Sequence, residues 1–379
     1  MAELFRIIDR FHIPGGETVY TVRPGKGALL RLDDILLDLH GNQFRVKGVE
    51  MPNGCFKDKP PMPMAEKPMG ILLESIHGAE IKGSILVKDI LEINFLFCNH
   101  PLFPCKVDED YVEEYQAARQ NHSCALFSYE NLEAGKLTLY GENIFGLTIY
   151  RGWMMKPDLY RNFYALLEEK GIFLINTPEE YERYHLLPGW YDDFKNETSE
   201  TVWTSGDRME DIISETKNLD GSYIVKDYVK SRKHEWYDAC FIRDIQDKEV
   251  AGKIIANFVE RQGSGLVGGV VLRKFERLKQ IGFHERSGMP LSEEYRVFIY
   301  AGKILALDDY WTQKSGAPIS DGEYQWIASI AAKVRSNFVT VDIARKEDGS
   351  LMIMEFGDGQ VSGLQQLGVG VFYGGRKGF

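Results

Sequence analysis

Cysteine is scarce in this sequence, and it has neither a long apolar run nor an excess of basic residues. The five cysteines among 379 residues are an odd, scattered set, which excludes a disulfide framework and predicts reduced thiols: Cys55, Cys98, Cys105, Cys124 and Cys240. No uninterrupted apolar run reaches the ~18 residues that a membrane span needs. The start of the sequence is charged from the third residue on and has no apolar signal core. We therefore expect a cytoplasmic protein without a membrane partner.

The charge balance excludes a broad, non-specific nucleic-acid surface. Lys and Arg number 45 and Asp and Glu 56, so the net charge is −11, although a local basic cleft is compatible with this total. The length suits two or three domains, and an apolar fraction of 44% is enough for several cores.

Several catalytic and binding motifs are also absent. The sequence has no P-loop, no G-x-S-x-G, no H-E-x-x-H and no G-x-G-x-x-G after a strand, so nothing supports a serine hydrolase or a dinucleotide site. Cys98, His100 and Cys105 lack a second pair of ligands, which argues against zinc.

The pattern of turns and periodicity predicts an α+β protein of three parts, with boundaries at 1–90, 91–200 and 201–379. Short strands broken by Gly and Pro turns in residues 1–90 predict a small closed β-barrel, with a bulge near Gly48. Five prolines between Met51 and Pro68 predict an extended loop.

Residues 91–200 alternate between strand and helix patterns, which predicts a parallel sheet covered by helices. We expect helices at 108–118 and 158–170 and strands at 146–150 and 172–176. Thr177-Pro178-Glu179-Glu180 is a capping box that begins a further helix.

Residues 201–379 mix helices with antiparallel pairs. Two hairpins are expected, turning at Ala301-Gly302 and at Lys346–Gly349, together with helices at 207–218, 248–261 and 321–335. The glycine-rich end, residues 368–379, either moves freely or closes over a site.

The last hairpin carries the strongest candidate site. Asp342 and Glu355 have the parity to share one sheet face on adjacent strands, with Asp358 close by. Converging carboxylates need a cation between them, and Mg²⁺ prefers a few carboxylates plus phosphate oxygens. The alternative is an ordinary solvated hairpin with scattered acids, since the register of a hairpin can slip.

Basic residues on three further segments are candidates for phosphate binding. Lys226 and Lys230 are expected on one face of a strand over 222–229, unless they simply protect a sheet edge. Arg273, Lys274 and Glu276 follow the loop GSGLVGG, whose backbone N–H groups suit phosphates, although many surface loops look alike. Arg296 in an apolar strand needs a partner, either an acid such as Glu294 or a phosphate.

The order of these pieces resembles the ATP-grasp superfamily, whose members hold ATP between two α+β subdomains and form an acyl phosphate that an amine attacks. YRVFIYAGKILALDDYW and VDIARKEDGSLMIMEFGDGQVSGL look like the divergent clade that includes the eukaryotic initiation-factor-2 assembly protein of the cell-division-cycle type. YRGWMMKPDLYRNFYALLEEKGIFLINTPEEYERYHLLPGWY looks like the pre-ATP-grasp segment of bacterial members. The resemblance covers about residues 95–375.

The resemblance implies a role for each matching residue. Lys226 would contact nucleotide phosphate, adenine would lie against the strand through Leu272 and Arg273, and Glu276 would contact the ribose. Arg296 would lie near the transferred phosphate, and Asp342 and Glu355 would hold the metal. Lys230 and Lys274 complete the expected nucleotide-binding set. Many members have Asn where this sequence has Gly357, so Asp358 or Gln360 would have to supply the missing oxygen.

Residues 1–90 resemble the second, β-barrel domain of elongation factor Tu and related translation GTPases. The similarity lies in F-x-I-P-G-x-x-T-V at Phe11–Val19, G-V-E-M at Gly48–Met51 and G-x-x-L-x-K at Gly83–Lys88. Val22 replaces a glycine that is common in that barrel. The resemblance implies the barrel fold more strongly than it implies a function.

We therefore expect a ligase that uses ATP and Mg²⁺ to join a carboxylate to an amine through an acyl phosphate, with Lys226 and Arg296 as its catalytic residues. Its substrates would include a peptide, protein or translation-related target. The alternative is an ATP-binding assembly protein without turnover, whose barrel docks a translation factor or tRNA. A nucleic-acid ligase with a lysyl-adenylate is disfavoured, because Lys226 is followed by Asp227-Tyr228-Val229 rather than by x-D-G.

Overall fold

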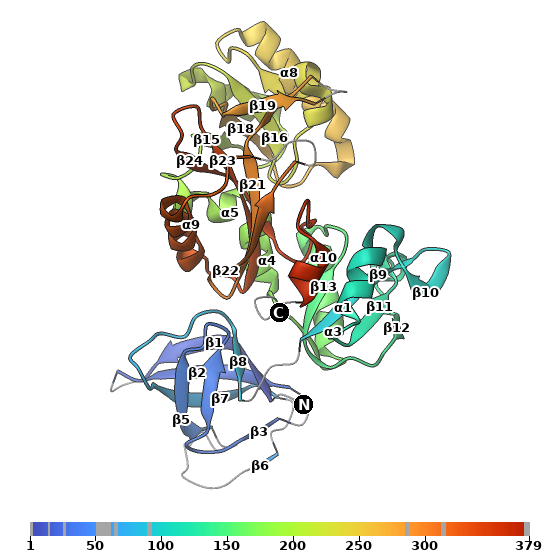
Figure 1. Cartoon of the computed structure of the whole chain (residues 1–379), viewed down its shortest axis with the longest axis vertical. Helices are drawn as coiled ribbons and strands as arrows, with labels where there is room; N and C mark the ends of the chain where they lie inside the picture. The colour runs from blue at the N-terminus through green and yellow to red at the C-terminus, as the bar shows by residue number, and fades with distance from the viewer. Residues whose placement is uncertain are drawn as a thin grey trace.

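The computed structural model describes residues 3–13, 16–25, 28–50, 62–63, 67–88, 93–284, 288–311 and 316–374. The chain forms a blue N-terminal barrel at one end, an α/β unit beside it, and a larger C-terminal unit that extends away from both (Figure 1). No helix in these ranges combines the length and the apolar character that crossing a membrane requires.

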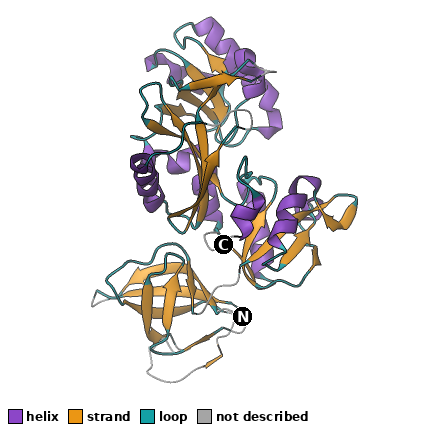
Figure 2. Ribbon diagram, viewed as in Figure 1, coloured by secondary structure: helices purple, strands orange, loops and turns teal. Residues whose placement is uncertain are grey.

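The N-terminal unit is a closed antiparallel barrel in the order β1-β2-β7-β5-β4-β8, which confirms the predicted barrel. Its strands are β1 (Leu4–His12), β2 (Thr18–Pro24), β4 (Ile35–Asp38), β5 (Gln43–Val49), β7 (Met69–Ser75) and β8 (Ile85–Val87). A two-stranded pair, β3 (Leu29–Leu30) with β6 (Met62–Pro63), lies beside it. Its described part contains strands and loops but no helix (Figure 2).

Alternation of apolar and polar residues builds this barrel. In β5, Phe44 and Val46 are buried while Arg45 and Lys47 are exposed. The register of β5 against β7 shifts between Val46 and Gly48, so the predicted bulge is confirmed. Most of the predicted proline loop, residues 51–61 and 64–66, lies outside the described residues.

The second unit is a mainly parallel sheet in the order β12-β11-β9-β13-β14, as the alternating pattern predicted. Its strands are β9 (Asn94–His100), β11 (Cys124–Phe127), β12 (Leu139–Gly141), β13 (Gly146–Arg151) and β14 (Ile172–Leu174); β10 (Phe103–Val107) pairs with β9. The helices are α1 (Val112–Ala118), after a 3₁₀ turn η1 (Glu109–Tyr111), α2 (Tyr129–Glu133), α3 (Pro157–Glu168), α4 (Pro178–His185) and α5 (Leu187–Phe194). The predicted capping box of Thr177 and Glu180 begins α4.

The C-terminal unit contains two four-stranded antiparallel sheets. The first has the order β15 (Thr201–Trp203), β18 (Val270–Lys274), β16 (Tyr223–Asp227), β17 (Phe241–Ile242) and packs against α6 (Met209–Glu215), α7 (Trp236–Ala239) and α8 (Lys248–Gln262). The second has the order β22 (Lys303–Asp309), β21 (Glu294–Tyr300), β23 (Phe338–Arg345), β24 (Leu351–Asp358). Short elements are η2 (Thr216–Asn218), η3 (Lys233–Glu235), η4 (Gly263–Gly265), β19 (Gln280–Phe283) and β20 (Pro290–Ser292).

The second sheet buries one face only. Side chains of α4, α5 and α9 (Asp321–Lys333) pack with Val297, Val341 and Phe356 into one hydrophobic cluster. Because side chains alternate along a strand, the neighbouring residues Arg296, Asp342 and Glu355 lie on the opposite face. The sheet therefore presents a polar face to the first sheet of this unit.

The glycine-rich end does not move freely over its described length. It forms α10 (Val369–Gly374), with Phe372 and Tyr373 buried, and this helix packs on α1. Residues 375–379 lie outside the described residues. Cys98, Cys105, Cys124 and Cys240 are free thiols, in agreement with the predicted reduced state, and Cys55 lies outside the described ranges.

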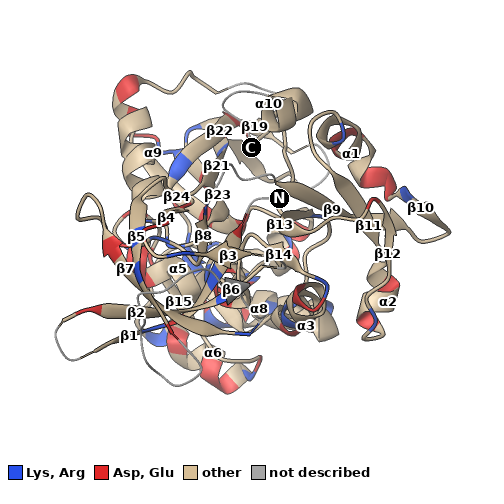
Figure 3. Cartoon of the chain, turned by 90° about the horizontal axis from the view of Figure 1, so that it is seen from below, with Lys and Arg blue, Asp and Glu red and all other residues tan. Residues whose placement is uncertain are grey.

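Lysine, arginine and acidic residues are interspersed along the chain in the view of Figure 3, in which blue and red segments alternate over all three units. The charges that matter for a site are therefore better identified by burial and pairing than by a surface patch.

Candidate active site

A row of charged side chains crosses the polar face of the second C-terminal sheet. Arg296 lies opposite Asp308 on one side and Asp342 on the other, and Asp342 lies opposite Glu355. The parity argument from the sequence thus agrees with the observed register of Asp342 and Glu355.

A bulge follows this row at the β23–β24 pair. Asp342 pairs with Glu355, but the next residue, Ile343, pairs with Ile353, so Met354 is an extra residue on β24. Bulges re-aim side chains and are frequent beside active sites. Met354 and Glu355 both line a cavity as a result.

This cavity lies between the two C-terminal sheets and has a volume of about 120 Å³. Its apolar wall includes Ile224, Trp236, Phe275 and Met354. Its charged lining comprises four cations and four acids: Lys226, Lys233, Arg273, Lys274, Glu276, Glu294, Asp342 and Glu355. We call it the carboxylate cleft.

Lys226 and Glu355 form an ion pair across the cleft, from β16 to β24. The Lys226 side chain is 9% exposed, whereas that of Glu355 is 37% exposed. Burial raises the pKa of the Glu355 carboxyl, but the nearby charges, chiefly that of Lys226, outweigh it and hold this pKa below its usual value. The glutamate is therefore ionised and able to accept a cation.

Arg296 makes a bidentate ion pair with Asp342, with Nε–Oδ1 and Nη2–Oδ2 distances of 2.8 and 2.7 Å. The guanidinium also donates to the Gly363 carbonyl at 2.9 Å and lies 4.9 Å from the centre of the Tyr310 ring. The partner that the sequence left open is thus an acid, Asp342 rather than Glu294. Both side chains of the pair are nearly buried, at 12% and 11% exposed.

Arg273 extends into the cleft from β18 with part of its hydrogen-bonding capacity unused. Its Nη2 donates to Thr198 Oγ1 at 2.8 Å and to the Ile353 carbonyl at 3.0 Å. Its Nη1 is buried and has no hydrogen-bond partner among the described residues. Burial lowers the pKa of Arg273 to about 10. An anionic ligand would supply the missing acceptor.

Lys233, which the sequence analysis missed, lines the same cleft from η3. Burial lowers the pKa of its ammonium, but the surrounding carboxylates, chiefly that of Glu294, outweigh this effect and raise the pKa. The only signal for it in the sequence is the basic run Arg232-Lys233-His234, which follows soon after the lysine strand.

Three predicted nucleotide-binding residues occupy different positions. Lys274 and Glu276 line the cleft, and the Lys274 ammonium pairs with Glu200 at 3.3 Å and Asp220 at 3.7 Å. Leu272 is 1% exposed and packs in the core beneath the first sheet, so its side chain faces away from the cleft.

Lys230 is not on the strand with Lys226, which corrects the predicted shared face. β16 ends at Asp227, whose Oδ1 accepts hydrogen bonds from the Val229 and Lys230 amides at 2.7 and 2.6 Å. This local side-chain bonding turns the backbone and ends the strand. Lys230 is exposed and does not line the cleft.

The structure also does not bring Asp358 to the carboxylate pair. Asp358 is three residues beyond Glu355 on β24, so its side chain lies on the other face of the sheet. It is fully buried and accepts hydrogen bonds from Asn176 Nδ2 at 2.5 Å and the Gln360 amide at 2.9 Å. Burial raises its pKa to about 6. Gln360 donates to Tyr160 at 2.8 Å, so neither residue supplies the oxygen that Gly357 lacks.

The residues present fit a magnesium–nucleotide complex. Mg²⁺ is typically bound by one or two carboxylates plus substrate phosphates, and Asp342 and Glu355 are two facing oxygen donors. Lysine and arginine suit the phosphate oxygens. In the part of the chain that the structure describes, no group of three or more His, Cys, Asp or Glu side chains is arranged to hold a metal alone.

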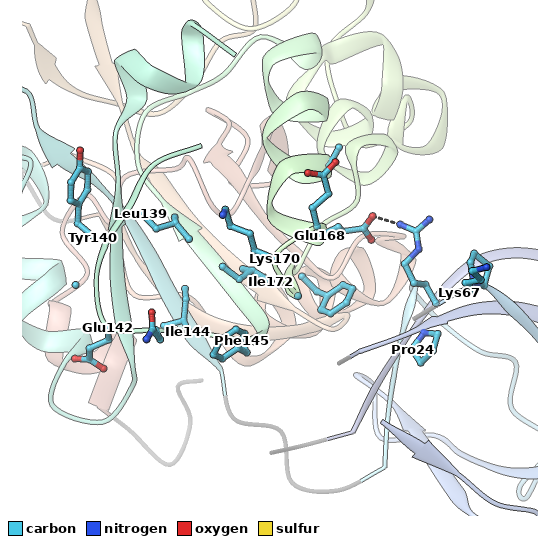
Figure 4. A pocket seen from close by; sticks show the side chains of 18 residues that line it. Pro24, Lys67, Leu139, Tyr140, Glu142, Ile144, Phe145, Glu168, Lys170 and Ile172 are labelled. Carbon is cyan, nitrogen blue, oxygen red and sulfur yellow. Dashed lines mark hydrogen bonds and ion pairs between the residues drawn. The ribbon is translucent and has the colours of Figure 1, made fainter. Parts of the chain in front are cut away.

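A larger cavity, of about 910 Å³, lies between the barrel and the α/β unit (Figure 4). Arg23 of β2 pairs with Glu168 of α3 on one side, and Lys170 and Ile172 lie in its middle. None of the predicted site residues lines this cavity.

Comparisons with known proteins agree with this geometry. Residues 215–373 match the model of an ATP-grasp domain, the third family of its clade, which confirms the predicted ATP-grasp domain. Among curated proteins, none matches the sequence significantly. The narrower resemblance to the initiation-factor-2 assembly protein and the likeness of the barrel to elongation factor Tu stay predictions.

Solved structures also align with the chain over most of their own length. D-alanyl-alanine synthetase A from Vibrio cholerae is 12% identical over 71% of this chain and 90% of its own, with a TM-score of 0.46. The ATP-grasp ligase PsnB, complexed with minimal precursor, Mg and ADP, is 12% identical over 72% and 91%, with a TM-score of 0.44. A RimK domain ATP-grasp protein from Sphaerobacter thermophilus is 13% identical over 73% and 95%, with a TM-score of 0.45. The first two are named as a synthetase and a ligase.

Proposed function

We propose that this chain, with an ATP-grasp domain at residues 215–373, is an ATP- and Mg²⁺-dependent ligase that joins a carboxylate to an amine. The observation that carries the proposal is the carboxylate cleft, where Lys226 pairs with Glu355 and Arg296 with Asp342 between two sheets. Acids that suit Mg²⁺ and cations that suit phosphates occupy one site.

The reaction proceeds in two steps. A carboxylate oxygen of the first substrate attacks the γ-phosphorus of ATP, the bond to the β–γ bridging oxygen breaks, and ADP and an acyl phosphate form. The amine nitrogen then attacks the acyl carbon, inorganic phosphate leaves, and the nitrogen loses a proton as the amide bond forms. Neither step requires a nucleophilic side chain, which is consistent with the absence of a catalytic triad motif.

The cleft residues act mainly by electrostatics. Lys226 and Arg296 neutralise charge on the moving phosphoryl group, and Arg273 donates its unpartnered N–H to a phosphate oxygen. Asp342 and Glu355 would hold Mg²⁺, which when bound screens the charge of the phosphates. Adenine lies along β18 near Arg273, with Glu276 toward the ribose. The Leu272 side chain takes no part, because it is buried in the core.

The remaining expectations belong to the same proposal. The substrates include a peptide or protein, the three parts divide at residues 90 and 200, and the protein acts in the cytoplasm. A contact of the barrel with a translation factor or tRNA stays a prediction.

The test is isothermal titration of the wild type and of Asp342→Asn with the Mg²⁺ complex of a non-hydrolysable ATP analogue. We expect the wild type to bind and the variant to lose at least ~10-fold in affinity, because Asp342 is one of two carboxylates that face the metal. Asp348→Asn is the matched control, since Asp348 lies in the turn of the same hairpin and is 66% exposed. Absence of Mg²⁺-dependent binding by the wild type would refute the proposal.

Turnover separates the ligase from the assembly protein. ADP release with a panel of carboxylates and amines indicates ligation. Nucleotide binding without ADP, together with a co-purified macromolecule of unchanged mass, would instead favour the assembly protein without turnover.

A further inference from the structure

Each carboxylate that would hold Mg²⁺ is already neutralised by a side chain of the protein. Glu355 is paired with Lys226, and Asp342 is paired with Arg296 through two hydrogen bonds. A metal ion that enters the cleft alone must therefore displace these cations or share the carboxylates with them.

Displacement without a nucleotide is unfavourable. The Lys226 and Arg296 side chains are only 9% and 12% exposed, so either cation would lose its partner while it remained poorly solvated. Leaving one member of a buried ion pair without its partner costs ~3–5 kcal/mol. Lys233 adds a third positive charge at the same carboxylates.

A nucleotide alone meets the opposite difficulty. Its phosphates would approach Lys226, but they would also approach the carboxylates of Glu355, Asp342 and Glu294, which line the same cleft. When metal and phosphates arrive together, the metal replaces the cations at the carboxylates and the phosphates replace the carboxylates at the cations. Every charge then keeps a partner.

We propose that Lys226 acts as a built-in counter-ion that couples metal binding to nucleotide binding in this cleft. The proposal rests on the proposed ATP site and adds that Lys226 weakens binding of free Mg²⁺ until phosphate draws its ammonium away from Glu355. The two ligands then bind as a unit, and by thermodynamic reciprocity each strengthens the other by the same factor.

Lys226, rather than Arg296, is the mobile member. Arg296 is fixed by two bonds to Asp342, by the Gly363 carbonyl and by the Tyr310 ring. Lys226 contacts Glu355 through a single ammonium on a flexible stem, and Glu355 is 37% exposed. Exchange of the lysine therefore requires the smaller rearrangement.

The experiment measures binding of Mn²⁺, as a paramagnetic substitute for Mg²⁺, to the full chain with and without ADP, by electron paramagnetic resonance. For the wild type we expect weak binding of Mn²⁺ alone and binding at least ~10-fold tighter in the presence of ADP. In Lys226→Met, we expect Mn²⁺ alone to bind at least ~10-fold more tightly than to the wild type, because Glu355 is free. ADP should bind the variant more weakly.

A matched control separates this effect from a general change of charge. Lys346→Met also removes one positive charge from the same hairpin, but Lys346 pairs with Asp348 in the turn, so Mn²⁺ binding should stay as in the wild type. Circular dichroism and thermal melting confirm that each variant is folded.

The outcomes distinguish the two proposals. If the wild type binds no ADP with or without Mn²⁺, both proposals fail. If the wild type binds Mn²⁺–ADP but Lys226→Met binds Mn²⁺ alone no more tightly than the wild type and Lys346→Met, only the counter-ion proposal is overturned.

Discussion

Arg273 has a buried guanidinium whose Nη1 lacks a partner among the described residues, although Nη2 bonds to Thr198 and to the Ile353 carbonyl. A buried N–H without an acceptor costs ~1–3 kcal/mol, and more when it is charged. Burial accordingly lowers the pKa of Arg273 to about 10. Such a cost is compatible with function when a ligand supplies the acceptor.

We predict that Arg273→Met weakens nucleotide binding without a large loss of stability. The lost charge-assisted hydrogen bond is worth ~1.5–3 kcal/mol, or about 10- to 150-fold in dissociation constant. Removal of a cation that is only partly paired offsets the loss of its bonds to Thr198 and Ile353. Titration calorimetry and thermal melting measure the two effects, with the exposed Arg208→Met as control. A large fall in melting temperature with unchanged affinity would assign Arg273 a structural role.

At the scale of single residues, sequence reasoning succeeded where one strand decided the answer. Strand parity predicted that Asp342 and Glu355 share a face, and the structure pairs them directly. It could not predict that Asp227 would bond to the Lys230 amide and end the strand, since that competition depends on local side-chain geometry. It missed Lys233 because a 3₁₀ turn has no periodic signal in the sequence.

At the scale of elements, two glycines bring the strands of the first C-terminal sheet close together. A Cβ on Gly269 would lie 1.8 Å from the Thr204 carbonyl oxygen, a backbone atom that cannot rotate away. A Cβ on Gly268, which has a φ of +72°, would meet the Tyr228 ring at 2.1 Å. The loop GSGLVGG therefore needs its last glycines for packing, whatever its other glycines contribute to phosphate binding.

We predict that Gly269→Ala lowers the free energy of unfolding by ~1–3 kcal/mol, because β15 and β18 must separate to admit the methyl group. Gly252→Ala in α8 is the matched control, since no atom lies within 4 Å of the added carbon. Alanine is favoured over glycine in helices, so this control should raise stability by about 1 kcal/mol. Urea unfolding measures both changes. Equal effects of the two substitutions would contradict the predicted clash.

At the scale of the whole molecule, the barrel shares a core with the other units. Leu4, Ile85 and Val87 of the barrel belong to one hydrophobic cluster with Phe173 of β14 and Phe338 of β23. The Arg6 guanidinium donates to the Leu174 carbonyl, and Ser84 contacts Glu180 of α4. The barrel is therefore packed against the rest of the chain rather than merely tethered to it.

This packing could not be predicted from the sequence. Leu4 and Val87 have the alternation of ordinary barrel-core residues, and nothing in the pattern shows which apolar positions face a second unit. Glu180 shows the same limit. The capping box predicted its bond to the Thr177 amide, observed at 2.7 Å, but not its burial among side chains of three units.

Glu180 makes the junction sensitive to pH. Its carboxylate also accepts a hydrogen bond from Asn337 at 3.3 Å, and it is 9% exposed. Burial raises its pKa from 4.5 to about 7, an effect that the Thr177 amide and the nearby charge of Arg6 only partly offset. Between these two pH values the folded chain binds more protons at this site than the unfolded chain. Glu180 thus stabilises the fold fully below pH 4.5, and this contribution is lost as the pH rises toward 7.

We therefore predict that the free energy of unfolding of the wild type, relative to Glu180→Gln, falls as the pH rises from 4.5 to 7. The glutamine cannot ionise, so taking the difference cancels the titration of groups common to both proteins, Asp358 among them. Urea unfolding at pH values of about 4.5, 6 and 8 measures the difference. Glu179→Gln, which changes a neighbouring glutamate that is 74% exposed, should give a difference nearly independent of pH. A pH-independent difference for Glu180→Gln as well would show that this carboxyl titrates alike in the folded and unfolded chains.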